Sequence, residues 1–276
     1  MIIWLASYPK SGNTWVRMLI GQILSEDRNK NSFFEGLKKI YNYPERVHFN
    51  KLVNDFSNRD EIIKNWINSQ NIINLKNENI ILKTHNILGS FGKYSFTNYK
   101  VTEGVIYIVR DPRNIISSLK NHFFLKDINE AKEFIFEKNQ WLFEKNRVDT
   151  FISSWNYHYK SWKTFKKNYL LIKYEDLLQN PSDQVLRICQ YLEKFFKINS
   201  QKINIDQIIE NSSFSNLQKI ENEGKFNENK VNQVTGEKAK FFHLGPLNNW
   251  RTMLDDKTVS DVEKNFRNEM KELGYL

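Results

Sequence analysis

The chain has very little cysteine, with Cys189 alone among its 276 residues. One cysteine excludes an internal disulfide framework and cannot supply the several thiolates of a structural zinc site. Its flanking residues, 185–188 and 191–192, are mostly apolar, so we expect Cys189 in the core. The sequence also shows no cluster of metal-ligating side chains, and no metal is predicted.

Long apolar runs are missing as well. No stretch approaches the roughly 18 apolar residues that a membrane-spanning helix needs. Residues 1–6 lead straight into a polar loop, without the basic region and small-residue cleavage site of a secretory signal. We therefore expect a cytoplasmic protein with no membrane span.

Composition sets the size of the fold but does not choose the ligand. With 40% hydrophobic residues the chain can build a substantial core, and we predict a single domain over residues 1–276. The net charge of +9 suits an anionic ligand, a nucleic acid or an anionic membrane surface equally well. Many lysines lie in polar stretches such as 76–79, so most of this excess is expected to be solvated surface.

Four apolar runs predict buried parallel strands, at residues 2–6, 80–82, 105–109 and 169–172. Each run is followed by a polar cluster, and the carboxyl ends of parallel strands share one edge of the sheet, where ligands bind. Helical patterns occupy segments between the runs, at 16–24, 115–123, 151–165 and 185–195. In one of these segments we expect a single buried helix face, formed by Phe151, Trp155, Tyr159 and Trp162.

The first polar cluster is the octapeptide YPKSGNTW at residues 8–15. It lies between a predicted strand and a predicted helix, where backbone N–H groups, a positive helix end and Lys10 could surround an anion. Because Lys10 precedes Gly12, the order is not that of the common nucleotide-binding loop. The alternative is that Lys10, Ser11 and Thr14 only solvate and cap the helix.

The second cluster is RDPRNIISS at residues 110–118. Arg110 and Ser118 place a fork of donors and a hydroxyl across a strand end and the following helix, and arginine can bind two phosphate oxygens at once. The alternative is an ion pair between Arg110 and Asp111 with an ordinary helix behind it.

These two segments resemble motifs of the sulfotransferases that use 3′-phosphoadenosine 5′-phosphosulfate (PAPS). The first resembles their loop Y-P-K-S-G-T-T-W, with Asn13 as the departure, and the second resembles their 3′-phosphate element R-[DN]-P-R-D-x-x-x-S, with Asn114 in place of aspartate. The motifs occur in the family's order. The resemblance implies a P-loop-like, three-layer α/β fold with a central parallel sheet flanked by helices.

A third segment, Lys83-Thr84-His85, resembles the K-[TS]-H element of cytosolic sulfotransferases. The resemblance implies that His85 is catalytic and that Lys83 lies near the transferred sulfuryl group. An acceptor hydroxyl must lose its proton as it attacks sulfur, and a histidine with a reference pKa of about 6.5 can take it. A structural histidine, with a carboxylate as the base, remains the alternative.

Weaker matches extend toward the C-terminus. Residues 174–177 resemble the family's Y-E-D-L element and residues 212–214 its [TS]-S-F element, both beside the adenine, and Trp15 could stack on the same base. Ordinary core packing is the alternative for these aromatic residues. The resemblance implies cofactor contacts by Lys10, Ser11, Gly12, Asn13, Thr14, Trp15, Arg110, Ser118, Tyr174, Ser212, Phe214 and Gly245.

The last match, at residues 245–251, is degraded. The family segment R-K-G-x-x-G-D-W-[KR] closes over the 3′-phosphate, but here His243 and Leu244 replace its basic pair and Asn248 replaces its second glycine. Asn249 stands in place of the aspartate. Closure must then rely on other donors, such as the Gly245 N–H, His243, Lys238 or Lys240.

Three further stretches have little pattern. Residues 218–240 are polar and predict a mobile loop, and insertions at about 25–79 and 122–150 are expected to form the acceptor site. Residues 257–263 partly resemble the family's dimer motif, but Leu254 occupies its required lysine position. A homodimer is therefore possible and the oligomeric state stays open.

The resemblance spans most of the chain and implies sulfuryl transfer from PAPS to a hydroxyl, or less readily an amine, of a glycan, lipid or small alcohol. His85 would act as the base, while Lys10 and Lys83 stabilise the leaving oxygen. A P-loop-type nucleotide kinase would instead need a Mg²⁺-binding carboxylate and the usual glycine–lysine order. A basic nucleic-acid-binding module would not explain clustered motifs at strand ends, so no nucleic-acid partner is expected.

Overall fold

The protein is described from a computed structural model, which covers residues 1–25, 40–76, 78–143, 147–226, 229, 231, 235–236 and 238–276. The strands are β1 (Ile2–Ser7), β2 (Tyr41–Asn42), β3 (Ile80–Thr84), β4 (Ser90–Phe91), β5 (Tyr94–Ser95), β6 (Thr102–Val109), β7 (Trp141–Leu142), β8 (Thr150–Phe151) and β9 (Tyr169–Lys173).

The α-helices are α1 (Asn13–Ile23), α3 (Arg59–Lys64), α4 (Trp66–Ile73), α5 (Pro112–Phe123), α6 (Ile128–Phe136), α7 (Trp155–Lys163), α8 (Tyr174–Gln179), α9 (Pro181–Leu192), α10 (Ile205–Asn211), α11 (Phe214–Asn222), α12 (Trp250–Met253), α13 (Asp256–Asn265) and α14 (Arg267–Glu272). Short 3₁₀ helices are η1 (Arg46–His48), η2 (Asn74–Lys76), η3 (Ser200–Lys202) and η4 (Gly245–Leu247).

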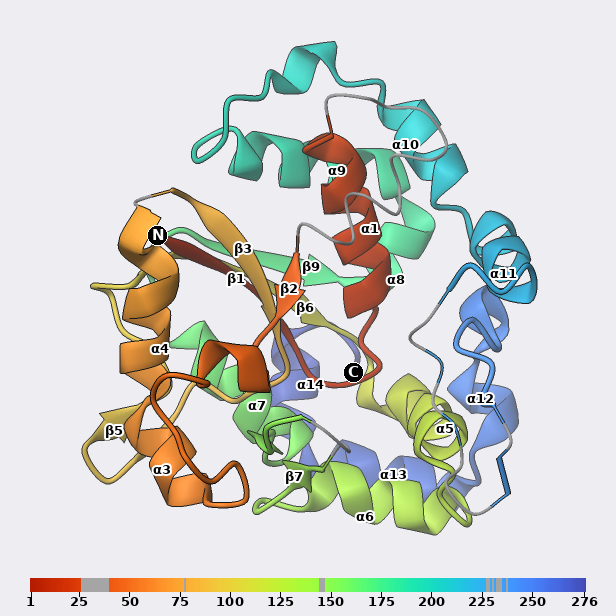
Figure 1. Ribbon diagram of the computed structural model, residues 1–276. Coiled ribbons are helices and arrows are strands. Elements are labelled where there is room, and N and C mark those ends of the chain that lie inside the picture. Colours follow the sequence, from red (N-terminus) through yellow and green to blue (C-terminus); the bar gives the residue numbers. More distant parts are fainter. Residues whose placement is uncertain are drawn as a thin grey trace.

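A five-stranded sheet in the order β2-β3-β1-β6-β9 forms the centre of the molecule. All of its neighbouring strands are parallel, and helices cover both faces (Figure 1). This architecture confirms the predicted three-layer α/β fold. The four predicted strands are all present, and the edge strand β2 is an addition too short for an apolar run to reveal.

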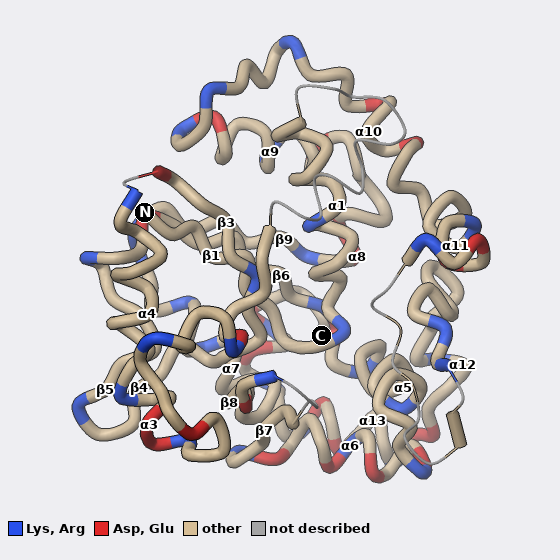
Figure 2. Tube along the Cα trace, viewed as in Figure 1, with Lys and Arg blue, Asp and Glu red and all other residues tan. Residues whose placement is uncertain are grey.

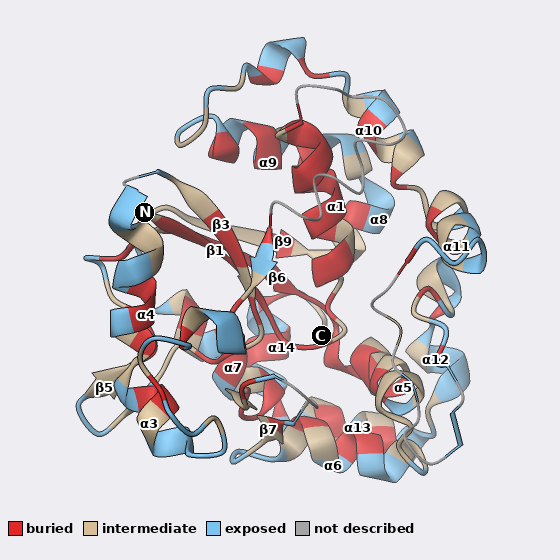
Figure 3. Cartoon of the chain, viewed as in Figure 1, coloured by how far each residue is buried: buried red, intermediate tan, exposed pale blue. Residues whose placement is uncertain are grey.

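Successive side chains of the central strands point to opposite faces of the sheet, and each face packs against its own hydrophobic core. In β1, Ile3 and Leu5 pack with the apolar residues of α1 and α9, whereas Trp4 faces the opposite layer. That opposite layer is rich in aromatic residues from α4 and α7. Figure 3 shows the consequence, because the sheet and the inner sides of the helices are buried while the outer helix surfaces are exposed.

Charged residues lie mainly around this core. Figure 2 shows lysine and arginine spread over many helices and loops, interspersed with aspartate and glutamate. Cys189 is fully buried within α9, as its apolar neighbours predict. Within the described ranges, no helix has both the length and the apolar character needed to cross a membrane.

Two element predictions need correction. The helix predicted for residues 151–165 begins at Trp155, so Phe151 belongs to β8 and lies outside the buried helix face that Trp155, Tyr159 and Trp162 do form. The stretch predicted as a mobile loop begins with helix: residues 218–222 complete α11, where Leu217 is buried. Residues 227–228, 230, 232–234 and 237 of that stretch lie outside the described residues.

Register brings the strand ends together. Ala6 pairs with Thr84, Ser7 with Ile108, and Val109 with Lys173, so β1, β3, β6 and β9 all end at one edge. The loop after β1, His85 after β3, Arg110 after β6 and Tyr174 after β9 therefore lie at this edge. The predicted convergence of polar clusters is confirmed.

Replacing Trp162 with alanine tests the aromatic layer. Trp162 is fully buried and its indole N–H donates to the Asn86 carbonyl over 2.9 Å. We expect Trp162→Ala to lower the free energy of unfolding by about 3–5 kcal/mol, because it leaves a cavity and an unpaired carbonyl. The matched control, Tyr157→Ala on the exposed side of the same helix, should cost under about 1 kcal/mol. Urea titrations followed by circular dichroism measure both values. Equal losses of unfolding free energy in the two variants would contradict a stabilising role for the aromatic layer.

Candidate active site

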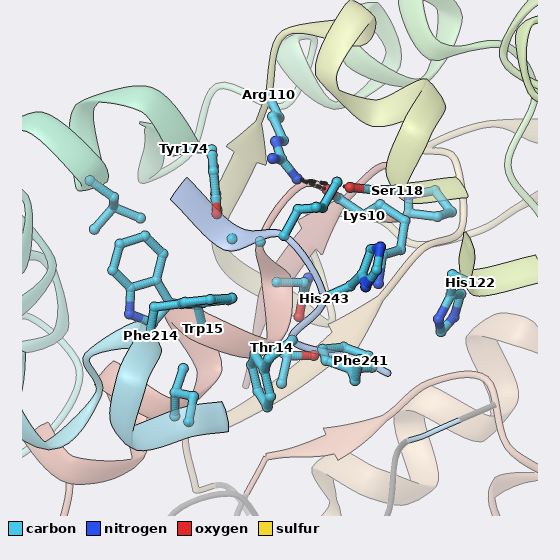
Figure 4. A pocket seen from close by; sticks show the side chains of 18 of the residues that line it. Lys10, Thr14, Trp15, Arg110, Ser118, His122, Tyr174, Phe214, Phe241 and His243 are labelled. Atoms are coloured by element: carbon cyan, nitrogen blue, oxygen red, sulfur yellow. Dashed lines mark hydrogen bonds between the residues drawn. The ribbon is translucent and has the colours of Figure 1, made fainter. Parts of the chain in front are cut away.

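A cavity of about 430 Å³ opens at the carboxyl edge of the sheet (Figure 4). Its walls come from the loop after β1, the ends of β3, β6 and β9, helices α5, α10 and α11, and the segment 241–246. The predicted site residues that line it are Lys10, Gly12, Asn13, Thr14, Trp15, Lys83, His85, Arg110, Ser118, Tyr174, Ser212, Phe214 and Gly245.

The loop after β1 has the conformation of an anion cradle. Lys10 and Gly12 both have positive φ, at 65° and 95°. A Cβ atom on Gly12 would lie 2.5 Å from Cδ2 of Tyr174, so the loop needs glycine both for its φ and for the ring packed against it. Helix α1 starts directly after this loop with no side-chain cap and no acidic residue in its first turn, which leaves its positive end uncompensated.

Ser11 is the predicted site residue that does not line the cavity. It is fully buried beneath the loop, and its Oγ has no hydrogen-bond partner among the described residues. Buried hydroxyls are almost always hydrogen-bonded in native proteins. The Ser11 hydroxyl therefore has unused hydrogen-bonding capacity within the loop, away from the cavity wall.

Arg110 joins the loop to helix α5. Its guanidinium lies 4.1 Å from the centre of the Tyr174 ring, and Nη1 donates to the Lys10 carbonyl oxygen over 3.1 Å and to Ser118 Oγ over 3.5 Å. Its Nε is buried and has no partner in the described part of the chain. The alternative pairing with Asp111 is wrong, because Asp111 binds Arg113 at 2.6 Å and thereby leaves Arg110 to the cavity.

His85 is held in one tautomer by the end of β1. Its Nδ1 lies 2.7 Å from the carbonyl oxygen of Ser7. A carbonyl can only accept, so Nδ1 carries the proton and Nε2 is left to take one up. Loss of hydration lowers the pKa of His85 well below 6.5 and the Lys83 charge lowers it further, so the ring is neutral at neutral pH.

A second histidine, His158, contacts the backbone of His85. His158 is fully buried, and its two ring nitrogens contact the Tyr107 hydroxyl at 2.8 Å and the His85 carbonyl oxygen at 3.1 Å. Burial lowers the pKa of His158 to about 3. Both depressed pKa values reduce the free energy of unfolding as pH falls below about 6.5, since the unfolded chain takes up protons that the folded rings do not.

Asn13, the departure within the first motif, connects the loop to His85. Its Nδ2 donates to the Leu5 carbonyl oxygen over 3.3 Å and to Ser7 Oγ over 3.1 Å, and Ser7 Oγ lies 3.3 Å from His85 Nδ1. The amide orientation is fixed because a carbonyl must face the NH₂ group. A threonine has no group that can donate to two acceptors in this way.

Aromatic side chains form one side of the cavity, where Trp15, Tyr174 and Phe214 lie together in Figure 4. The Trp15 and Tyr174 rings meet edge to face with centroids 5.7 Å apart. Phe214 packs so closely on Gly245 that no side chain fits there, while Ser212 donates its hydroxyl to the Ile208 carbonyl within α10. This side suits a flat ring system.

The sequence interpretation missed several cavity residues. The Phe241 ring lies 4.2 Å from Lys10 Nζ in a cation–π contact, and His122 from the end of α5 lines the same region. No local pattern distinguishes these residues, although Phe241 directly precedes the degraded closing segment. Of the suggested replacement donors, His243 lines the cavity, whereas Lys238 and Lys240 do not.

The predicted acceptor insertions are partly described. Residues 26–39, 77 and 144–146 lie outside the described ranges. From the remainder, Asn42, His122, Phe123, Leu142 and Arg147 contribute to the cavity wall. Over the part of the chain that the structure covers, no three His, Cys, Asp or Glu residues gather into a possible metal site.

Comparison with known proteins identifies the family of this chain. The sequence model of the sulfotransferase domain matches residues 2–274. The chain belongs to the sulfotransferase domain family. A 3-beta-hydroxysteroid sulfotransferase from Cavia porcellus is 26% identical over 273 residues, which are 98% of this chain and 83% of the relative. The protein is thus an enzyme of the sulfotransferase class.

Solved structures share the fold of this sulfotransferase. A retinol dehydratase in a complex with retinol and PAP superposes with a TM-score of 0.62 at 18% identity, over 98% of this chain and 81% of the other. A mouse sulfotransferase complexed with PAP gives 0.58 at 18% identity, over 98% and 84%. These likenesses confirm the P-loop-like α/β fold that the motifs imply.

The protonation state of His85 can be observed directly. We expect the neutral ring with its proton on Nδ1 at neutral pH and somewhat below the ordinary pKa of about 6.5, because hydration is lost and Ser7 holds that proton. Nitrogen-15 NMR of labelled histidine rings distinguishes the two tautomers and the cation, and His85→Gln assigns the signal. A doubly protonated ring just below neutrality, or a proton on Nε2, would contradict this geometry.

Proposed function

We propose that this sulfotransferase moves a sulfuryl group from PAPS to a hydroxyl, less readily an amine, of a small alcohol, lipid or glycan. The observation that carries the proposal is the meeting of Lys10, Arg110 and the proton-accepting Nε2 of His85 around one cavity. The names of the fold relatives are consistent with it, since two of them were solved with PAP.

The donor is held by its phosphates and its adenine. The loop N–H groups, Ser11 and Thr14 bind the 5′-phosphosulfate at the positive end of α1. Arg110 and Ser118, which both line the cavity, bind the 3′-phosphate. The aromatic side formed by Trp15, Tyr174 and Phe214 receives the adenine.

His85 acts on the acceptor. PAPS supplies the sulfuryl group, and the acceptor hydroxyl attacks sulfur while His85 Nε2 takes its proton. The negative charge of a bound donor raises the pKa of His85 from its depressed value, because a nearby anion favours the imidazolium form. The ring is therefore a better base in the donor complex than in the free enzyme.

Charge develops on the opposite side of the sulfur. The oxygen that bridges sulfur and phosphorus becomes negative as the bond to sulfur breaks, and Lys10, helped by Lys83 and Thr14, stabilises it. The positive end of α1 contributes in the same direction. Once the bisphosphate has left, the proton on His85 returns to solvent.

The acceptor binds where the two insertions contribute to the wall. Asn42 comes from the first insertion, and Phe123, Leu142 and Arg147 come from the second. This mixture of apolar and polar groups suits a hydroxyl on a partly apolar molecule. The relative named for a 3-beta-hydroxysteroid supports a small-molecule acceptor.

Nucleotide binding distinguishes this function from its alternatives. We expect saturating adenosine 3′,5′-bisphosphate to raise the melting temperature by about 5 °C at a hundredfold excess over its Kd. ATP with Mg²⁺ and a short oligonucleotide should have much smaller effects. Arg110→Gln should abolish the bisphosphate effect, because it removes the charged fork at the 3′-phosphate. Stabilisation by ATP with Mg²⁺ alone would instead favour a nucleotide kinase, and by oligonucleotide alone a nucleic-acid-binding module.

Turnover tests the base. With labelled PAPS and a panel of steroids, phenols, sugars and lipids as acceptors, we expect His85→Ala to lower kcat by about a hundredfold or more while the Kd of the bisphosphate stays nearly constant. His122→Ala is the matched control, because it removes another histidine from the same cavity. Equal losses of kcat and donor affinity in His85→Ala would make His85 a structural residue. A loss of kcat in His122→Ala alone would instead identify His122 as the base.

A further inference from the structure

Asn248 stands where the resembling motif has its second glycine, and its side-chain amide both donates and accepts hydrogen bonds. The residue is 7% exposed. Its Nδ2 donates to the Asn114 carbonyl oxygen over 2.8 Å and to Ser118 Oγ over 2.9 Å, while its Oδ1 accepts from Ser117 Oγ over 2.7 Å. The amide cannot be turned around, because the Asn114 carbonyl can only accept.

These contacts decide the direction of the Ser118 hydroxyl. Two donors face its oxygen, Asn248 Nδ2 and, at 3.5 Å, Arg110 Nη1. The hydroxyl proton of Ser118 has no acceptor among the described residues, and the side chain lines the cavity beside Arg110 (Figure 4). Ser118 is thus oriented as a hydrogen-bond donor toward whatever anion Arg110 binds.

The same amide fastens the closing segment to α5. The Trp250 N–H donates to Asn114 Oδ1 over 2.9 Å, beside the bonds that Asn248 makes to this helix. Gly245, three residues earlier, is thereby held against Phe214 at the cavity wall. The segment is secured by neutral amides, although His243 and Leu244 replace the basic pair.

We propose that Asn248 is a positioning residue for the 3′-phosphate of the donor and acts through Ser118. The inference rests on the proposed function, since it assumes that Arg110 and Ser118 bind that phosphate. Asn248 keeps the Ser118 oxygen occupied as an acceptor, so its proton remains directed at the phosphate. This neutral arrangement compensates for the missing basic pair.

The test compares two nucleotides that differ only in the 3′-phosphate. Adenosine 3′,5′-bisphosphate and adenosine 5′-monophosphate are titrated calorimetrically into the full chain carrying Asn248→Gly or Asn248→Asp. We expect each variant to weaken bisphosphate binding about tenfold or more and monophosphate binding less than about threefold, because a hydrogen bond to a charged group is lost. In Asn248→Asp the carboxylate also accepts the Ser118 proton, so this loss should be the larger.

Two controls separate positioning from general damage. Asn249→Asp adds the same charge at the exposed neighbour and should leave the ratio of the two affinities unchanged. Adding Asn248→Gly to Ser118→Ala should cost little more than Ser118→Ala alone, because the effect passes through the hydroxyl. Retained monophosphate binding shows that each variant is folded.

Several results would overturn the inference alone. Equal losses for both nucleotides would make Asn248 a structural residue, and multiplied losses in the double variant would mean that it acts independently of Ser118. Unchanged bisphosphate affinity in Asn248→Gly would exclude any role. If the wild-type chain itself binds the two nucleotides equally, the proposed donor site fails as well.

Discussion

The parallel pairing of β1 with β3 and β6 is the constraint on which the rest of the structure depends. Because all three strands run the same way, their carboxyl ends meet at one edge. Residues separated by about a hundred positions, such as Lys10 and Arg110, become neighbours there. Burial of both faces of β1 makes this register costly to shift, since a slip by one residue would exchange the two cores.

Tyr174 extends that constraint into the site. Its ring packs against Gly12 on one element and the Arg110 guanidinium on another, so three strand ends are joined by a single aromatic side chain. Asp111 does not compete for Arg110, because it binds Arg113. The arrangement keeps donors in place at the cavity wall, where they can interact with an anion without reorganisation.

Two asparagines, Asn13 and Asn248, link the site to the elements around it. Asn13 links the loop to Ser7 and so to His85, while Asn248 links the closing segment to α5 and to Ser118. Each places an amide donor where the resembling motif has a smaller or simpler residue. At both positions the departure from the family pattern therefore adds hydrogen bonds.

Much of this could be predicted from the sequence. The apolar runs predicted every strand of the sheet except β2, and the residues that the motifs named all line the cavity except Ser11, because strand periodicity and loop chemistry are local properties. The tertiary structure decided what depends on distant partners. It placed Phe241 over Lys10, began the aromatic helix at Trp155 and fixed the tautomer of His85 through Ser7. These features follow from packing between elements far apart in the chain, which no local pattern encodes.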